Sequence, residues 1–153
     1  MLALWGKELR IIMNLQEIQH AVLTDHVRLR EMLQEVEGLA EQVEKSEKYE
    51  PDILREQGRQ LYHQLKEHLN FEERVLLPRL RDAGPEERER ALRLQADHAE
   101  QQELLRFLLT RIQERARPTL LIARELVNFS QCLHEDLRNQ EEVIWGASPP
   151  PCQ

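Results

Sequence analysis

The chain is acidic and rich in residues that favour helices. Its 153 residues carry 21 Lys and Arg against 28 Asp and Glu, a formal net charge of −7. This charge argues against nucleic acid as a partner, because duplex binding needs a positive surface. The length suits one domain with a sizeable core. Aromatic residues make up 5% of the chain and only five residues are Gly, which is typical of long helices rather than of a sandwich or barrel.

The sequence predicts a protein of the cytoplasm without a membrane span. No run approaches the roughly 20 apolar residues that a spanning helix needs. Residues 1–13 are partly apolar, but Lys7 and Arg10 interrupt them and no small-residue cleavage site follows, so a signal peptide is not expected. Cys132 and Cys152 form no disulfide framework, which fits a reducing compartment.

Two long helices are predicted in the first half of the chain. Asn14 followed by Glu17 is a capping-box pattern, so the first helix is expected from there to about Lys45. Pro51 suits the first position of a helix, and the second helix is expected from Pro51 to about Leu80. The residues before Asn14 would form an N-terminal arm.

Two more helices are predicted in the second half. Residues 82–85, Asp-Ala-Gly-Pro, are the clearest break in the chain, and the third helix is expected from Pro85 to about Arg115. Pro118 opens the fourth helix, which should end near Trp145 before a glycine.

The short connections between these helices predict an all-α fold, an antiparallel up-down-up-down four-helix bundle. Apolar residues spaced by threes and fours give each helix a stripe that can pack against its neighbours. The predicted organisation is an arm over residues 1–13, the bundle over 14–146 and a flexible Pro-rich tail over 147–153.

Two segments of the chain repeat two others. Residues 24–33 align without a gap on 96–105, and residues 65–76 align on 133–144. The apolar positions match in the repeat, but some of the polar residues do not. The second alignment opposes these pairs: His68 with Asp136, and Glu72 with Gln140.

Histidines and carboxylates interrupt the apolar stripes. His68 and Glu72 lie one turn apart, so they can bind one metal ion or two adjacent ions. Burying such groups unpaired would cost several kcal/mol each, whereas a cation would satisfy them together. The sequence therefore predicts a metal site with ligands from all four helices, namely His26, His68, Glu72, His98 and Asp136.

Two alternatives to this ligand set remain open. The first is a metal-free polar layer in which His68 bonds Asp136, Glu72 bonds His26 or His98, and Gln140 bridges the rest. In the second, His134 is the ligand in place of Asp136. His134 lies about 200° round the helix from Asp136, and choosing it would give up the gapless alignment. His134, His20 and His63 are expected on a flank or in solvent. Glu141 and Glu142 are expected at the solvated end of the fourth helix.

Taken together, these residues resemble the hemerythrin-like, or HHE cation-binding, domain from about Asn14 to Trp145. The resemblance implies a four-helix bundle whose core holds a pair of non-haem iron ions, used for oxygen or nitric oxide binding, sensing, iron handling or repair of iron centres. His26, His68, Glu72 and His98 match ligands of the family. The fourth helix departs from the family, because Asp136 and Gln140 stand where a His and a Glu are usual. The motifs that carry the resemblance are Asp25-His26, His68-x-x-x-Glu72-Glu73 followed by Leu77-Pro78, Asp97-His98, and the final Glu-Glu-Val-Ile.

The expected function is that of a hemerythrin-like protein that binds one or two non-haem iron ions and senses oxygen or nitric oxide, or handles iron. The alternative is a metal-free bundle that serves as a protein-interaction or regulatory module. Its partner, or a second copy in a homodimer, would bind through the arm over residues 1–13. No nucleophile is paired with a base, so enzymatic activity is not expected.

Overall fold

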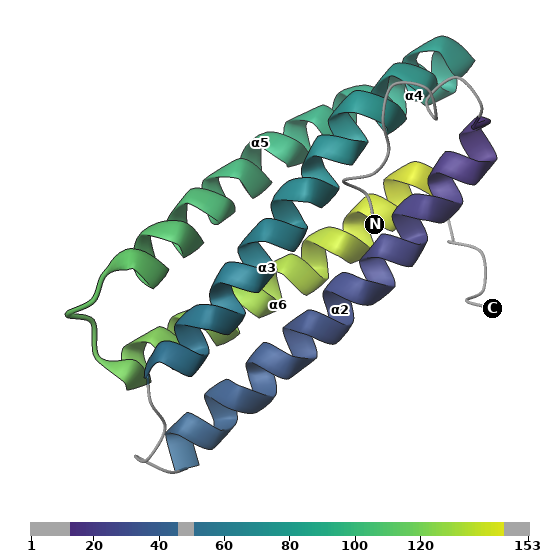
Figure 1. Ribbon diagram of the computed structural model, residues 1–153. Helices are drawn as coiled ribbons and strands as arrows, with labels where there is room; N and C mark the ends of the chain where they lie inside the picture. Colours follow the sequence, from purple (N-terminus) through teal and green to yellow (C-terminus); the bar gives the residue numbers. More distant parts are fainter. Residues whose placement is uncertain (1–12, 46–50, 146–153) are drawn as a thin grey trace.

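The computed structural model describes residues 13–45 and 51–145, which form four long helical rods (Figure 1). The second rod is one continuous run of three elements, and it includes a short π-helix. The predicted arm and tail lie outside the described residues, apart from Met13. In chain order the elements are α2 (Leu15–Lys45), α3 (Pro51–Phe71), η2 (Glu72–Leu76), α4 (Leu77–Ala83), α5 (Pro85–Gln113) and α6 (Thr119–Trp145).

The rods run up, down, up and down, and consecutive rods pack side by side (Figure 1). The first rod, α2, contacts α3 and α6, while α5 contacts α3, α4 and α6. This arrangement confirms the predicted all-α four-helix bundle.

The helix ends follow local sequence signals. The backbone N–H of Glu17 donates a hydrogen bond to Oδ1 of Asn14 at 2.8 Å, which is the predicted cap of α2. Pro51 and Pro85 occupy the first positions of α3 and α5. A backbone N–H at this position has no partner within the helix, so proline, which lacks one, costs no hydrogen bond there. Gly84 separates α4 from α5 with φ of 157°, a value that residues with a side chain rarely adopt.

Two apolar clusters fill the interior, one toward each end of the bundle. The larger cluster includes Leu29 of α2 and Leu137 of α6, and the smaller includes Val22 of α2 and Ile144 of α6. On every rod, buried polar residues separate the two clusters. We call these residues the polar layer: Asp25, His26, His68, Glu72, His98, Gln101, Gln140 and Glu141.

The second rod widens at Glu72, where it enters the polar layer. The N–H of Leu77 bonds the carbonyl of Glu72, five residues back, so this turn holds one extra residue. Pro78 follows directly, and in a regular α-helix its ring would clash with the carbonyl of Arg74. We attribute the wide turn to this clash. The rod continues to Ala83, beyond the predicted end at Leu80.

Two helical glycines allow a matched test of the packing. A Cβ on Gly38 would meet no atom within 4 Å, so Gly38→Ala is expected to raise the free energy of unfolding by up to about 1 kcal/mol. A Cβ on Gly58 would lie 2.8 Å from Cδ1 of Ile112, so Gly58→Ala should lack that gain. Gly58→Val should cost about 1–3 kcal/mol through overpacking. Urea unfolding measures all three, and a Gly58→Val protein as stable as the wild type would contradict the close approach of α3 and α5.

Candidate metal centre

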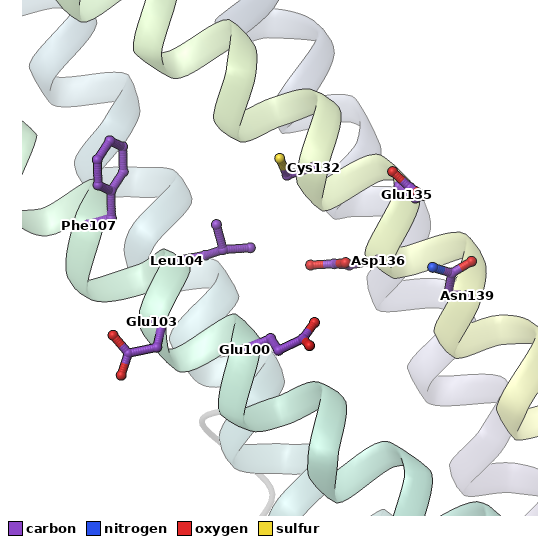
Figure 2. A pocket seen from close by; sticks show the side chains of 8 residues that line it. All are labelled: Glu100, Glu103, Leu104, Phe107, Cys132, Glu135, Asp136 and Asn139. Atoms are coloured by element: carbon purple, nitrogen blue, oxygen red, sulfur yellow. The ribbon is translucent and has the colours of Figure 1, made fainter.

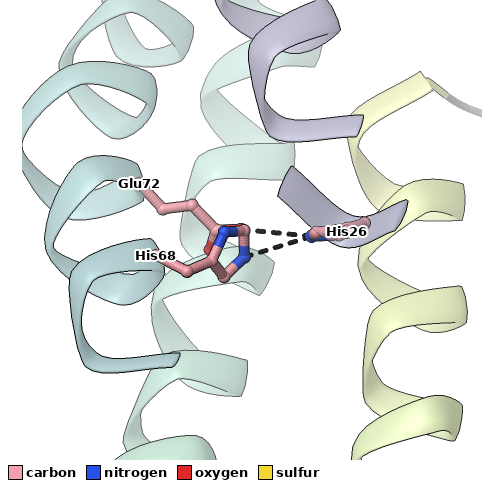
Figure 3. A group of neighbouring side chains, drawn as sticks. All are labelled: His26, His68 and Glu72. Carbon is pink, nitrogen blue, oxygen red and sulfur yellow. Dashed lines mark hydrogen bonds and ion pairs between the residues drawn. The ribbon is translucent and has the colours of Figure 1, made fainter. Parts of the chain in front are cut away.

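Three side chains meet in the middle of the polar layer, and all three are fully buried. His26 comes from α2, His68 from α3 and Glu72 from η2, and each offers a ligand atom within 4.8 Å of the other two (Figure 3). The Nε2 atoms of the two histidines are 3.1 Å apart. Oε1 of Glu72 lies 2.5 Å from Nε2 of His68 and 3.6 Å from Nε2 of His26. The three atoms face one another closely enough to share one cation.

His98 of α5 joins this group through the other oxygen of Glu72. Its Nε2 contacts Oε2 of Glu72, while its Nδ1 lies 3.5 Å from Oε1 of Glu73. The two neighbouring carboxylates of η2 therefore approach the same imidazole from its two nitrogens. The structure thus brings together His26, His68, Glu72 and His98, four of the five predicted ligands.

Carboxylates hold the far side of both inner histidines. Nδ1 of His68 lies 2.6 Å from Oδ2 of Asp25, and Nδ1 of His26 lies 3.3 Å from Oε1 of Glu141. Arg30 donates two hydrogen bonds to Glu141, at 2.6 and 2.7 Å. Histidines that bind metal ions usually donate their second N–H to a carboxylate in this way, which fixes the ring and its tautomer.

These outer contacts determine what the centre of the layer can hold. A neutral imidazole has one N–H, and if Nδ1 donates it to a carboxylate, Nε2 presents a lone pair. Nε2 of His26, Nε2 of His68 and Oε1 of Glu72 then form a group of acceptors without a donor between them. Such a group needs a cation or an additional proton. Imidazole nitrogens with a carboxylate oxygen suit iron, zinc or copper, so the residues fit a transition-metal ion.

Without a metal ion, a proton satisfies the layer. Burial opposes a charged imidazole, but Glu72 and Asp25 outweigh it and raise the pKa of His68 to about 10. Burial likewise opposes the ionised form of Glu72, yet His68 and the other histidines hold the pKa of Glu72 well below its usual value. Metal binding at neutral pH must therefore displace the proton of His68, which makes the affinity fall as the pH falls.

Asp136, the fifth predicted ligand, lies outside this layer. It is half-buried and points from α6 into a groove of about 640 Å³ that α5 and α6 form (Figure 2). Within the described part of the chain, no hydrogen bond or ion pair joins Asp136 to the polar layer. Its neighbour Leu137 is fully buried instead, four residues after Leu133, because an apolar side chain gains more from burial than a carboxylate. The structure therefore does not bring Asp136 together with the other four predicted ligands, and in α6 it is Glu141 that contacts His26.

Asp136→Asn tests whether Asp136 binds the metal ion. Burial, with the nearby carboxylates of Glu100, Asp97 and Glu135, raises the pKa of Asp136 from 3.8 to about 6. A raised pKa means that the folded state favours the neutral acid. The contribution of Asp136 to the free energy of unfolding is therefore fully present below pH 3.8 and is lost as the pH rises through about 6. Relative to Asp136→Asn, the wild type should thus lose stability between about pH 4 and 6, as thermal unfolding would show. The variant should bind as much metal as the wild type, and a loss of metal would restore Asp136 as a ligand.

The remaining histidines lie away from the centre. His20 and His63 are exposed, as expected. His134, the alternative ligand, is half-exposed, and its Nε2 lies 3.1 Å from Oε1 of Glu37. The metal-free alternative paired His68 with Asp136, whereas the structure pairs His68 with Asp25.

Sequence reasoning missed the carboxylates that hold the histidines. Glu141 was expected in solvent, but only 5% of its surface is exposed, because Arg30 and His26 both bind it. One signal was available, since Arg30 follows His26 by four residues and lies on the same face of α2. Asp25 belongs to the Asp25-His26 motif of the family resemblance, but helical spacing did not indicate its contact with His68, because Asp25 lies about 100° round the helix from His26.

Comparison with protein families supports the same interpretation. The family model described as the hemerythrin HHE cation binding domain matches residues 17–146. The chain belongs to the hemerythrin family. The match spans all four rods and every residue of the polar layer. Comparisons with curated proteins and with solved structures gave no significant match. Among the described residues of this hemerythrin-family chain, no helix has a stretch long and apolar enough to cross a bilayer.

Proposed function

We propose that this hemerythrin-family protein binds one non-haem iron ion through His26, His68, Glu72 and His98. The observation that carries the proposal is the group of facing acceptor atoms, in which Nε2 of His26, Nε2 of His68 and Oε1 of Glu72 lie within 4.8 Å of one another. Among the described residues, this is the one such group of His, Cys, Asp or Glu. On α6 the layer contributes the neutral Gln140, which is a poor ligand for a second ion.

The surrounding chain supports a stable site. Asp25 and Glu141 fix the two inner imidazoles from behind, and Arg30 holds Glu141 in turn. The apolar clusters on either side of the layer exclude bulk water, which strengthens each electrostatic contact. Bound iron would supply an electrophilic centre able to bind a small diatomic molecule.

We further propose that the bound molecule is oxygen or nitric oxide and that the role is sensing or iron handling rather than catalysis. The described layer offers carboxylates, imidazoles and amides but no hydroxyl or thiol nucleophile beside a base. A cytoplasmic location and a dimer remain predictions from the sequence.

A second candidate function follows from the 2.5 Å contact between Nε2 of His68 and Oε1 of Glu72, where a proton can take the place of the cation. If a proton satisfies the layer permanently, the chain is a metal-free member of the fold that acts through its surface. The two candidates differ in whether iron binds the folded protein.

Metal analysis separates the candidates. Protein purified from iron-supplemented cells should contain about one iron per chain and show a charge-transfer band that dithionite or nitric oxide changes. The metal-free protein should unfold at a higher temperature after anaerobic addition of ferrous iron. Iron-free protein whose unfolding temperature does not respond to iron would eliminate the metal-binding function.

A further inference from the structure

The groove between α5 and α6 that receives Asp136 has an acidic end and an apolar end (Figure 2). The two helices run in opposite directions, so Glu100 of α5 lies toward the same end as Asp136 of α6. Phe107 of α5 and Cys132 of α6 lie toward the other end. The groove has a volume of about 640 Å³, which is enough to receive several side chains of a partner.

The carboxylates at the acidic end lack the ion pairs that neutralise other carboxylates of the same helix. Within the described part of the chain, no ion pair involves Glu100, Glu135 or Asp136. By contrast, Glu86 of α5 accepts a hydrogen bond of 2.7 Å from Arg90, one turn further along. Burial and the neighbouring carboxylates, Glu100 first among them, raise the pKa of Asp136 to about 6. This end of the groove would therefore gain from a cation supplied by another molecule.

The apolar end exposes an aromatic side chain. Phe107 is 42% exposed, and Leu104 beside it is half-buried. Arg111 lies over the ring of Phe107, 4.7 Å from its centroid, so the positive charge near this end is already in contact with the protein itself. Aromatic residues are enriched where proteins bind one another. The apolar end therefore suits an apolar side chain of a partner.

The length of the groove matches one face of a helix. Its lining residues span 100–107 on α5 and 132–139 on α6, which is about two turns of each helix, or roughly 10 Å. An amphipathic helix lays residues spaced by threes and fours into a groove of this kind. A second copy of this chain is a poor occupant, because its net charge of −7 would be repelled by the carboxylates. A basic partner is attracted by the same charges.

We propose that the groove between α5 and α6 is a docking site for a basic amphipathic helix of another protein. Lysine or arginine side chains of the partner lie among Glu100, Glu135 and Asp136. An apolar side chain of the partner, one or two turns away, packs on Leu104 and Phe107. This inference goes beyond the proposed metal binding and does not depend on it, because no residue that lines the groove belongs to the polar layer.

A synthetic peptide tests the acidic end. The probe is a fluorescently labelled peptide of about 15 residues, long enough to form a helix, with leucine on one face and lysine on the other. We expect the protein to bind this peptide at low salt, as measured by fluorescence anisotropy, and not to bind a version with glutamate in place of lysine. Replacing Glu100 and Glu135 together by Gln should weaken binding about five- to tenfold, the effect of two exposed ion pairs.

Two carboxylates of α2 supply the control for this double variant. Glu35 and Glu44 are exposed, take part in no ion pair among the described residues and do not line the groove. Replacing both by Gln removes the same charge and should leave the affinity for the peptide almost unchanged. Equal affinities of the two double variants would overturn the proposal, and so would a wild-type protein that does not bind the lysine peptide.

The apolar end has a matched pair on one helix. Phe107→Ala should weaken binding of the lysine peptide about tenfold, the effect of losing a central aromatic contact. Leu92→Ala changes a residue of α5 that is 63% exposed and lies outside the groove, so it should have little effect. Sedimentation velocity of the protein alone distinguishes the other occupant. A wild-type dimer that Phe107→Ala converts to a monomer would assign the groove to a second copy and overturn the proposal.

Discussion

Replacing His68 is expected to abolish metal binding and, with it, the thermal stabilisation that metal gives the wild type. His68 lies at the centre of the layer, with Glu72 at 2.5 Å, Asp25 at 2.6 Å and His26 at 3.1 Å. His68→Ala removes a ligand and also leaves two buried carboxylates without their partner, so the metal-free protein should lose about 3–5 kcal/mol of stability. His68→Gln keeps much of the volume and hydrogen bonding, and it should fold while still failing to bind metal.

Thermal unfolding with and without the metal ion measures this effect. A ligand at 100 times its dissociation constant stabilises the folded state by about 2.7 kcal/mol, and this increment should vanish in His68→Gln. The exposed His63, replaced in the same way, serves as the control and should leave the increment intact. Equal stabilisation of the wild type and His68→Gln would place the metal elsewhere.

Neutralising Glu141 is expected to weaken metal binding about 10- to 100-fold without preventing folding. Glu141 contacts Nδ1 of His26 and receives two hydrogen bonds from Arg30. Burial opposes ionisation of Glu141, but His26 and Arg30 outweigh it and lower its pKa to about 2, so the carboxylate is ionised at neutral pH. Glu141→Gln removes the charge that increases the basicity of His26 and fixes its tautomer.

Glu142 offers a matched control for this experiment. It is the next residue of α6, carries the same charge and is exposed, so Glu142→Gln should leave metal affinity almost unchanged. Competition with a chelator of known affinity gives the dissociation constant for each protein. If both substitutions had the same effect, the loss would reflect net charge alone, and the role assigned to Glu141 would be wrong.

The sequence was sufficient for the fold because the helix ends carry strong local signals. Asn14 caps α2 as predicted, and Pro51 and Pro85 begin their helices. The rod through Glu72 ends later than predicted, at Ala83, because Pro78 is accommodated by a wide turn rather than by the end of the helix.

The structure brings together the predicted ligands of three rods but not the one on the fourth. The gapless repeat correctly matched Leu69 with Leu137 and Glu72 with Gln140, and all four residues are buried. The repeat does not extend to the burial of Asp136, because α3 buries both His68 and Leu69 whereas α6 buries only Leu137 of the corresponding pair. Asp136 and Leu137 follow the buried Leu133 by three and by four residues, so they lie on opposite edges of the same helical stripe. Which of the two is buried depends on the helix that packs against the stripe.

The carboxylates behind the histidines depend on contacts between rods. Glu141 is separated from Arg30 and His26 by more than a hundred residues, and helical periodicity on α6 alone does not indicate that they meet.

X-ray absorption at the iron edge of the iron-loaded protein tests the central claim most directly, because it reports the atoms bound to the metal ion. We expect a first shell of nitrogen and oxygen atoms together with the outer-shell scattering of imidazole rings. We expect His68→Gln to lose the bound iron and, with it, the imidazole contribution to the spectrum. Iron bound without imidazole scattering, or an identical spectrum from His68→Gln, would contradict a metal centre built from His26, His68, Glu72 and His98.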